Sequence, residues 1–291
     1  MNASHVSFSH RDSEPEEKVL YIVGTPIGNL NDISIRAKNI LEKVSLIACE
    51  DTRTTGKLLK KLEISNKLVS FHKHNSFQRL DYLISKLVDG ESIALVSDAG
   101  MPSISDPGEI LIKKAKEVNL DIICIPGPCA AINAIVCSGL DSSKFTFYGF
   151  IPKSSTERKV LLKEIYESKI SSIVYESPKR ILKLLEDLKT FCGGKRKLVL
   201  LKELTKKYEQ HFGNNIDEVL KIIKETEPRG EYTFVINGNE EKAKDSISRE
   251  NIKNDLLNLI QAGLSHSAAA SYLSKKYNKS KSEVYNLIIK K

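Results

Sequence analysis

The sequence predicts an α/β protein, and two observations support that prediction. Short apolar runs alternate along the chain with longer amphipathic runs, a pattern typical of strands that alternate with helices. The apolar run at residues 93–96 stops at the loop Ser97-Asp98-Ala99-Gly100. Ligands of parallel α/β sheets bind where strands end, and a carboxylate beside a glycine suits a ribose hydroxyl or an ammonium group. An ordinary strand-to-helix turn would look the same, so this loop alone decides nothing.

Length and composition set the outer limits. The chain has 291 residues and 41% hydrophobic content, enough for two domains and a small appendage. No apolar run approaches the roughly 18 residues of a membrane span. Residues 1–18 are polar and lack the apolar core of a signal peptide, so we expect a disordered tail. The five cysteines have no metal-ligand spacing, which favours a reduced, cytoplasmic protein without a metal.

The first α/β domain is expected over residues 19–148. A strand at residues 20–23 runs into the loop Gly24-Thr-Pro-Ile-Gly-Asn29, and Asp32 is expected to cap the first helix, which continues to Val44. Further elements alternate in the same way: strand 46–49, helix 55–62, strand 68–71, helix 77–88, strand 92–96, helix 109–118 and strand 122–125. The last strand ends at Pro126-Gly-Pro128, and a helix of small residues begins at Cys129.

A second α/β domain is expected over residues 149–239, after a hinge near Gly149 to Pro152. The pattern restarts around residues 145–148. Its further elements are strands at 172–175, 198–201 and 232–236 and amphipathic helices at 178–191 and 216–224. A charged linker is expected at residues 240–250.

Residues 251–291 predict a small helical module. Three short helical patterns cover residues 252–261, 267–277 and 281–289, and Gly263 ends the first of them. Ser265 or Ser267 can cap the second helix, and Ser280 or Ser282 the third. Three short helices with tight turns fit a helix-turn-helix module, and a plain packing domain fits as well.

Charge leaves the partner open. The net charge is +8, and residues 275–291 contain six lysines against one glutamate. A basic segment of this kind suits a nucleic-acid partner, but it can also be a solvated face.

Three strand-end loops share one character: residues 24–29, 97–100 and 126–128 are rich in proline and glycine. None is a Walker loop or a Gly-x-Gly-x-x-Gly motif, which disfavours ATP and NAD. Rigid loops that expose backbone groups suit a ligand held mostly by main chain, such as S-adenosylmethionine.

Eight motifs in order carry a resemblance to a known family. They are Gly24-Thr-Pro-Ile-Gly-Asn-Leu30, Ala48-Cys-Glu-Asp-Thr-Arg53, Ser97-Asp-Ala-Gly100, Ser105-Asp-Pro-Gly108, Pro126-Gly-Pro-Cys-Ala-Ala131, Gly149-Phe-Ile-Pro152, Tyr175-Glu-Ser-Pro178 with Arg180, and Glu203-Leu-Thr-Lys206. Together they resemble the ribosomal RNA small subunit methyltransferase I family of the tetrapyrrole-methylase superfamily. The likeness runs from about residue 19 to 239, and the last segment resembles that family's helix-turn-helix appendage.

The resemblance implies a fold and an activity. The fold is two α/β domains of the tetrapyrrole-methylase type with the cofactor cleft between them. The activity is S-adenosylmethionine-dependent 2′-O-methylation of a cytidine ribose in the decoding region of 16S rRNA. It also implies a homodimer whose partner is the small ribosomal subunit, with no DNA and no membrane. Met101, where the family usually has threonine, and the run 72–76 depart from the pattern.

The resemblance also implies the site residues. Cofactor contacts are expected from Pro26, Ser97, Asp98, Ala99, Gly100, Ile104, Ser105, Pro128, Cys129, Ala130, Phe150 and Thr233. From their place at a strand end beside Arg53, Glu50 and Asp51 are the candidates to take the proton of the ribose hydroxyl, and a capping carboxylate with an ion pair to Arg53 is the competing interpretation, which the sequence favours somewhat more.

Substrate contacts are expected from Arg53, His74, Tyr175, Glu176, Arg180, Glu203 and Lys206. The cations suit phosphate or ribose oxygens, the two glutamates can orient those cations, and Tyr175 can stack on a base. Surface salt bridges and core packing are the competing interpretations.

Two other functions stay open. A tetrapyrrole C-methylase would share the fold without needing a basic helical module. A non-catalytic RNA-binding protein would keep the module without the chemistry.

Overall fold

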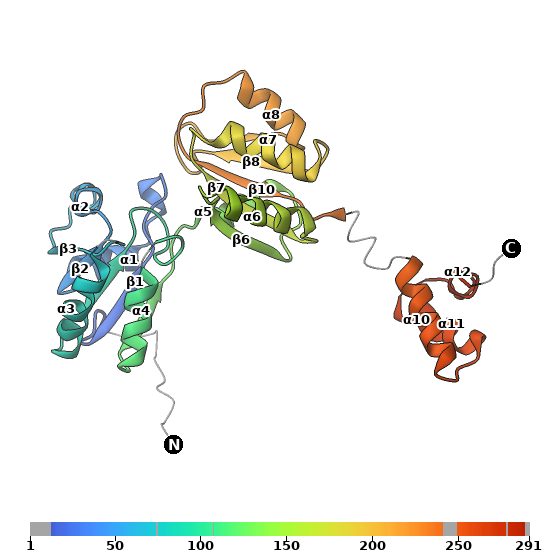
Figure 1. Cartoon of the computed structure of the whole chain (residues 1–291). Coiled ribbons are helices and arrows are strands. Elements are labelled where there is room, and N and C mark those ends of the chain that lie inside the picture. The colour runs from blue at the N-terminus through green and yellow to red at the C-terminus, as the bar shows by residue number, and fades with distance from the viewer. Residues whose placement is uncertain (1–12, 74, 107, 241–248, 278, 289–291) are drawn as a thin grey trace. The chain divides into compact units, whose positions relative to one another are not determined.

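The computed structural model describes residues 13–288 except 74, 107, 241–248 and 278. By internal contacts the chain divides into two compact units, one of residues up to Leu162 with Ser171–Asn237, the other of Lys163–Ile170 with Gly238 onward. No helix in the described part is long and apolar enough to cross a membrane. The expected α/β class is confirmed, since two separate sheets are present together with the C-terminal helices (Figure 1).

The first sheet is five-stranded and entirely parallel, in the order β3-β2-β4-β1-β5. Its strands are β1 (Val19–Val23), β2 (Leu46–Cys49), β3 (Leu68–Ser70), β4 (Ile93–Val96) and β5 (Asp121–Ile125). Buried apolar residues occupy both faces, as helices on both sides of a parallel sheet require. Since β1 lies between β4 and β5, the loops that follow these three strands emerge side by side.

Four helices cover the two faces of this sheet. α1 (Ile35–Lys43) and α2 (Thr52–Lys61) pack on one face, and α3 (Ser76–Val88) and α4 (Gly108–Glu117) on the other. The expected Asp32 cap is wrong. Asp32 ends a short 3-10 turn, and Ser34 caps α1 by accepting a hydrogen bond from the Ala37 backbone N–H at 3.0 Å.

The second sheet is mixed, in the order β6-β7-β10-β8-β9. Its strands are β6 (Phe145–Phe150), β7 (Ser171–Glu176), β8 (Leu198–Lys202), β9 (Gln210–Phe212) and β10 (Tyr232–Ile236). β6 starts before the boundary expected at residue 149, and the register of its pairing with β7 shifts between Phe147 and Gly149. The expected hinge therefore overlaps a strand.

The helices of the second sheet were only partly predicted. α5 (Ala130–Ser138) packs on it through Ala131, Ala134 and Ile135. α7 (Ile181–Cys192) and α8 (Ile216–Lys224) match expectation closely. α6 (Ser155–Glu167) and the short strand β9 were not predicted.

The helical module is α10 (Arg249–Gln261), α11 (His266–Lys276) and α12 (Lys281–Tyr285). Ser265 caps α11, and Ser280 caps α12 in a capping box with Glu283. Its core is formed by Ile252, Leu256, Ala269, Ala270, Leu273 and Val284. The expected linker at residues 240–250 lies largely outside the described residues, and α10 begins within it.

Most of the expected disordered tail also lies outside the described residues. In the described part, Glu14 accepts a hydrogen bond from Arg36 Nε at 2.7 Å. These residues therefore contact the domain before β1 begins.

Candidate cofactor and catalytic site

Three strand-end loops are tied together at one point. Thr25 and Gly100 form an isolated antiparallel bridge, with N···O distances of 3.0 and 3.1 Å. The buried Thr25 hydroxyl donates toward the Ser97 and Gly100 carbonyls at 3.3 and 3.4 Å. Residues more than seventy positions apart thus share a small hydrogen-bonded unit at the edge of the first sheet.

Close backbone contact explains two glycines in these loops. A Cβ on Gly24 would lie 2.6 Å from the Gly127 Cα, closer than real Cβ atoms approach. Gly100 has φ +83°, and a Cβ there would lie 3.2 Å from the Pro128 carbonyl oxygen. Both positions need glycine for the loops to pack together.

A cavity of about 470 Å³ opens beside these loops and extends to the second sheet. Thirteen of the predicted site residues line it: Glu50, Ser97, Asp98, Ala99, Gly100, Ile104, Ser105, Cys129, Ala130, Phe150, Tyr175, Glu176 and Thr233. Pro26, Asp51, Arg53, Pro128, Arg180, Glu203 and Lys206 are not among its lining residues. His74 lies outside the described residues.

Sequence reasoning missed several lining residues. Ile27, Leu201 and Leu204 supply apolar wall, and Asp106 supplies a carboxylate. Asp106 Oδ1 accepts hydrogen bonds from the Ser103 and Gly108 backbone N–H groups, both at 2.9 Å, while Oδ2 is buried without a partner among the described residues. Its motif, residues 105–108, was noted in the sequence, but no ligand contact was expected from Asp106.

Asp98 connects two of the loops. Its Oδ1 accepts a hydrogen bond from the Asp51 backbone N–H at 3.1 Å. Burial raises the pKa of Asp98, and that hydrogen bond offsets part of the rise. Its carboxylate therefore fixes the end of β2 relative to the end of β4 while still facing the cavity.

Asp51 is engaged at the start of α2. It caps the helix by accepting from the Arg53 backbone N–H at 2.8 Å, and its other oxygen contacts Arg53 Nη2 at 2.7 Å. The side-chain and backbone hydrogen bonds from Arg53 lower the pKa of Asp51 to about 2. A carboxylate of such low basicity takes up a proton poorly near neutral pH.

Glu50 is in the opposite situation. It is partly buried, lines the cavity, and within the described part of the chain no group hydrogen-bonds its carboxylate. Burial raises the pKa of Glu50, and the charges of Asp98 and Asp106 raise it further. Of the two neighbouring carboxylates, Glu50 is the one suited to accept a proton.

Aromatic rings form part of the wall contributed by the second sheet. Tyr175 makes edge contacts with Phe147 and Phe150 at centroid distances of 5.0 and 5.5 Å. Burial raises the pKa of the Tyr175 hydroxyl. Phe150 also lines the cavity and remains 59% exposed.

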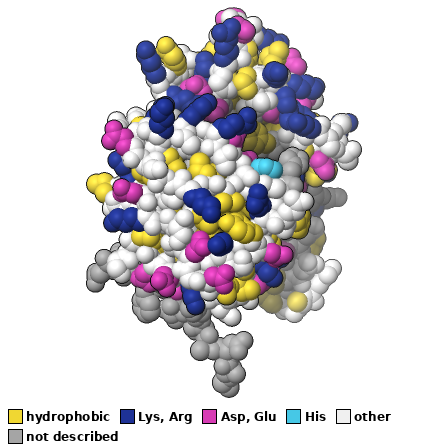
Figure 2. Space-filling model, turned by 90° about the vertical axis from the view of Figure 1, so that its left-hand side faces the viewer, with side chains coloured by type: hydrophobic (Ala, Val, Ile, Leu, Met, Phe, Trp, Pro, Cys, Tyr) yellow, Lys and Arg dark blue, Asp and Glu magenta, His cyan; other side chains and the backbone are white. Residues whose placement is uncertain are grey.

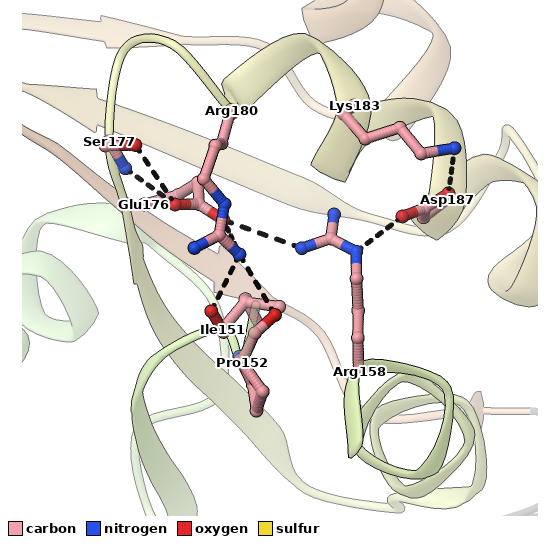
Figure 3. A network of polar contacts seen from close by, with 8 residues as sticks. All are labelled: Ile151, Pro152, Arg158, Glu176, Ser177, Arg180, Lys183 and Asp187. Atoms are coloured by element: carbon pink, nitrogen blue, oxygen red, sulfur yellow. Dashed lines mark hydrogen bonds and ion pairs between the residues drawn. The ribbon is translucent and has the colours of Figure 1, made fainter. Parts of the chain in front are cut away.

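Glu176 and Arg180 belong to a buried polar network (Figure 3). Glu176 Oε1 accepts from the Ser177 backbone N–H at 2.8 Å, and Oε2 lies 3.2 Å from Arg180 Nη2. Arg180 Nη2 also donates to the carbonyls of Ile151 and Pro152 at 2.7 and 3.1 Å. Glu176 thus orients Arg180, and the guanidinium of Arg180 donates mainly to backbone carbonyls of the segment that follows β6.

Glu203 and Lys206 form a second pair. Lys206 Nζ lies 2.9 Å from both Glu203 Oε1 and Glu231 Oε2. Burial alone would raise the pKa of Glu203, but the hydrogen bonds from Lys206 and from the Glu231 backbone outweigh burial and hold the pKa low. The pair braces Glu231, which lines the cavity.

Known proteins resemble this chain at two levels. The family model for tetrapyrrole (corrin/porphyrin) methylases matches residues 19–220. Ribosomal RNA small subunit methyltransferase I of Synechocystis sp. is 41% identical over 92% of this chain and 96% of its own length. The protein of that name from Escherichia coli O157:H7 is 40% identical over 95% and 96%.

Solved structures support the fold alone. Uroporphyrin-III-C-methyltransferase from Thermus thermophilus has a TM-score of 0.55 and 16% identity, covering 76% of this chain and 94% of its own. A cobalt precorrin-4 methyltransferase has a TM-score of 0.58 and 13% identity, covering 76% and 95%.

Proposed function

The chain belongs to the ribosomal RNA small subunit methyltransferase I family of tetrapyrrole methylases, and from that premise we propose that it methylates ribosomal RNA of the small subunit. The substrate atom is the 2′-hydroxyl of a cytidine in the decoding region of 16S rRNA, as the family resemblance implies. The observation that carries the proposal is the cavity beside Gly100, where a proton-accepting carboxylate faces a wall able to hold S-adenosylmethionine.

The residues of the cavity fit that cofactor. Ser97, Asp98, Ala99 and Gly100 bring the loop after β4 to the cavity wall, so its backbone groups can contact a ligand directly. Asp98 and Asp106 place negative charge where a sulfonium and an ammonium group would be stabilised. Ile27, Leu201, Leu204 and Tyr175 supply an apolar surface for an adenine. When bound, S-adenosylmethionine supplies an activated methyl group on its sulfonium.

We assign Glu50 as the base that accepts the proton of the ribose hydroxyl. A ribose hydroxyl is a weak nucleophile, and a base within hydrogen-bond reach accelerates its attack by about 10²–10⁴-fold. With the cofactor bound, the Glu50 carboxylate would accept the hydroxyl proton, and the cofactor would supply the methyl group to the hydroxyl oxygen, its sulfonium sulfur leaving as a neutral thioether. Asp51 keeps Arg53 and the start of α2 in place, and Asp98 holds the Asp51 backbone beside the cavity.

A homodimer is part of the proposal. Its support within the chain is an apolar strip on α5, where Ile132 is 48% and Val136 72% exposed at a spacing of one helical turn. Light scattering on the full chain measures the mass directly, and a monomeric mass at micromolar concentration would contradict the dimer.

One experiment tests the reaction. The protein is incubated with methyl-labelled S-adenosylmethionine and either small ribosomal subunits or a tetrapyrrole precursor. Label in the ribose of a 16S rRNA cytidine is the expected result. Label only in the tetrapyrrole would assign the other branch of the superfamily, and no label with either would leave RNA binding without catalysis.

Cofactor binding has its own test in the same cavity. Asp98→Ala should weaken S-adenosylmethionine binding by about 1–3 kcal/mol, typical of a lost hydrogen bond to a charged group. Gly100→Val should weaken it more, because φ +83° and the nearby Pro128 carbonyl both exclude a β-branched side chain. Asp81→Ala on the exposed surface of α3 is the control. Calorimetry that finds parental affinity in both cavity variants would contradict this location.

A further inference from the structure

Helix α2 is amphipathic in an unusual way. Its buried side consists of Thr55 and Leu59, and Leu59 joins the core of the first sheet. Its exposed side carries Arg53, Lys57, Lys60 and Lys61, and the helix contains no carboxylate. With 3.6 residues per turn, these four positions fall within about a third of the circumference. The result is one continuous cationic stripe, which we call the α2 stripe.

The lysines of the α2 stripe are not neutralised within the protein. Among the described residues, Lys57, Lys60 and Lys61 make no ion pair. Most other helices with cations also contain acids, as in the pair of Lys183 with Asp187 on α7 at 2.9 Å. α11 is the other described helix that has cations and no acid, and its Lys276 is paired with Asp255 of α10. The α2 stripe therefore keeps its charge exposed.

The α2 stripe starts at the rim of the cavity. α2 begins at Thr52, directly after the candidate base Glu50 and the capping residue Asp51. The Asp51 backbone N–H is bound to Asp98, a residue of the cavity wall. From Arg53 to Lys61 the helix rises by about 12 Å at 1.5 Å per residue. Figure 2 looks onto the side where α2 lies in Figure 1 and shows lysine and arginine side chains on that face.

We propose that the α2 stripe is a phosphate-binding track for the RNA strand next to the nucleotide that enters the cavity. This inference rests on the proposed function, because a polymer that delivers one ribose to the cavity must continue across its rim. Phosphates of that strand meet the lysines and release counterions as they bind. Lysines bind phosphates whatever the base sequence of the RNA. The track therefore positions the strand, and the cavity selects the base.

The test removes the three unpaired lysines together. Lys57→Gln, Lys60→Gln and Lys61→Gln in one full-length chain should raise the KM for small subunits about tenfold, with kcat within about twofold. A plot of log affinity against log salt should become shallower by about 2, from roughly 0.7 per phosphate contact on a single strand. Affinity for S-adenosylmethionine should equal that of the parent, which shows that the fold beside the cavity is intact.

A matched control removes the same charge elsewhere. Lys113, Lys114 and Lys116 lie on α4, which packs on the opposite face of the first sheet, and their triple glutamine variant should behave as the parent. Equal KM and salt slope in parent, α4 control and α2 variant would overturn the track and show a solvated face. A variant weakened on subunits but not on a single-stranded RNA oligonucleotide would also overturn it, in favour of a ribosomal protein contact.

The proposed function and the role of the α2 stripe can be disproved separately. If the parent transfers no methyl group to small subunits, the proposed function is wrong whatever the variants do. The oligonucleotide arm still tests the α2 stripe in that case, through the salt slope alone.

Discussion

At the scale of single residues, two adjacent carboxylates have been given different chemistry by their surroundings. Asp51 accepts hydrogen bonds from Arg53, which hold its pKa near 2. Glu50 is partly buried among other carboxylates, and its pKa is raised. Neighbouring acids with diverging pKa values are a common arrangement where one must accept or hold a proton and the other must stay charged.

Glu50→Gln is the sharpest test of this division. It should lower the single-turnover rate by roughly 10²-fold or more, while S-adenosylmethionine affinity changes little. Asp51→Asn keeps a good helix cap and should stay within a few-fold of the parent. In the parent, the rate should rise with pH as Glu50 loses its proton, with a midpoint above that of an ordinary glutamate. A parental rate in Glu50→Gln would exclude Glu50 as the base.

The same substitution has a predicted effect on stability. Because the folded-state pKa of Glu50 is raised, the folded protein holds this proton more tightly than the unfolded chain does. The free energy of unfolding therefore falls as pH rises through the folded pKa of Glu50. At neutral pH, Glu50→Gln should therefore melt at a higher temperature than the parent. Substitution of a catalytic residue often stabilises a protein in this way, because active sites trade stability for activity.

At the scale of elements, a buried charge network joins β7 and α7 to the segment after β6 (Figure 3). The Glu176 side chain is 1% exposed and lies 3.2 Å from Arg180 and 3.7 Å from Arg158. Arg158 in turn contacts Asp187 at 2.7 Å. Glu176 also lines the cavity beside Tyr175, so the network fixes part of the cavity wall.

Glu176→Gln should destabilise the fold by about 3–5 kcal/mol, because it leaves the partly buried Arg180 without its carboxylate partner and Arg158 with Asp187 alone. Lys183→Gln is the control from the same network, since Lys183 is 70% exposed and its loss should cost within about 0.5 kcal/mol. The stability changes of both variants are measured from the midpoints of denaturant unfolding, provided that the m-value is unchanged. Equal midpoints for the two variants would show that Arg180 and Arg158 are held by the backbone carbonyls and Asp187 alone.

At the scale of the whole molecule, the helical module has its own core and uses part of its charge internally. Lys276 lies 2.7 Å from Asp255, which also accepts a hydrogen bond from the Tyr277 hydroxyl. Lys275, Lys279 and Lys281 make no ion pair among the described residues. The module therefore has both the packing of a stable unit and positive charge that no described acid neutralises.

Ending the chain after Asn239 tests the module. Asn239 must stay, because its backbone N–H donates to the Ser168 carbonyl at 2.7 Å. The shortened chain should bind S-adenosylmethionine and dimerise as the parent does, but attach to small subunits more weakly and with a shallower salt dependence. The full chain with glutamine at 275, 279 and 281 should share the shallower slope. Unchanged subunit binding in both would mean that these lysines are only a solvated face.

The sequence by itself determined the order of most elements and the three strand-end loops. The spacing of apolar residues is a local property of the sequence, so both ends of β10 and α8 were predicted to the residue. It failed where local signals were weak or ambiguous. β9 has three residues and exists because it pairs with β8, and the first helix is capped by Ser34 and not by the expected Asp32.

Only the tertiary structure decided which of the predicted site residues lie together and what surrounds them. Thr25 meets Gly100 across seventy-five positions of sequence, and Asp98 meets the backbone of Asp51 across forty-seven. Burial and the charges of Asp98 and Asp106, which come from other loops, raise the pKa of Glu50, whereas the low pKa of its neighbour Asp51 comes from hydrogen bonds with Arg53, two residues along the chain. The physical reason is that burial and nearby charge set how tightly a carboxylate holds its proton, and for Glu50 both come from segments that only the fold brings together.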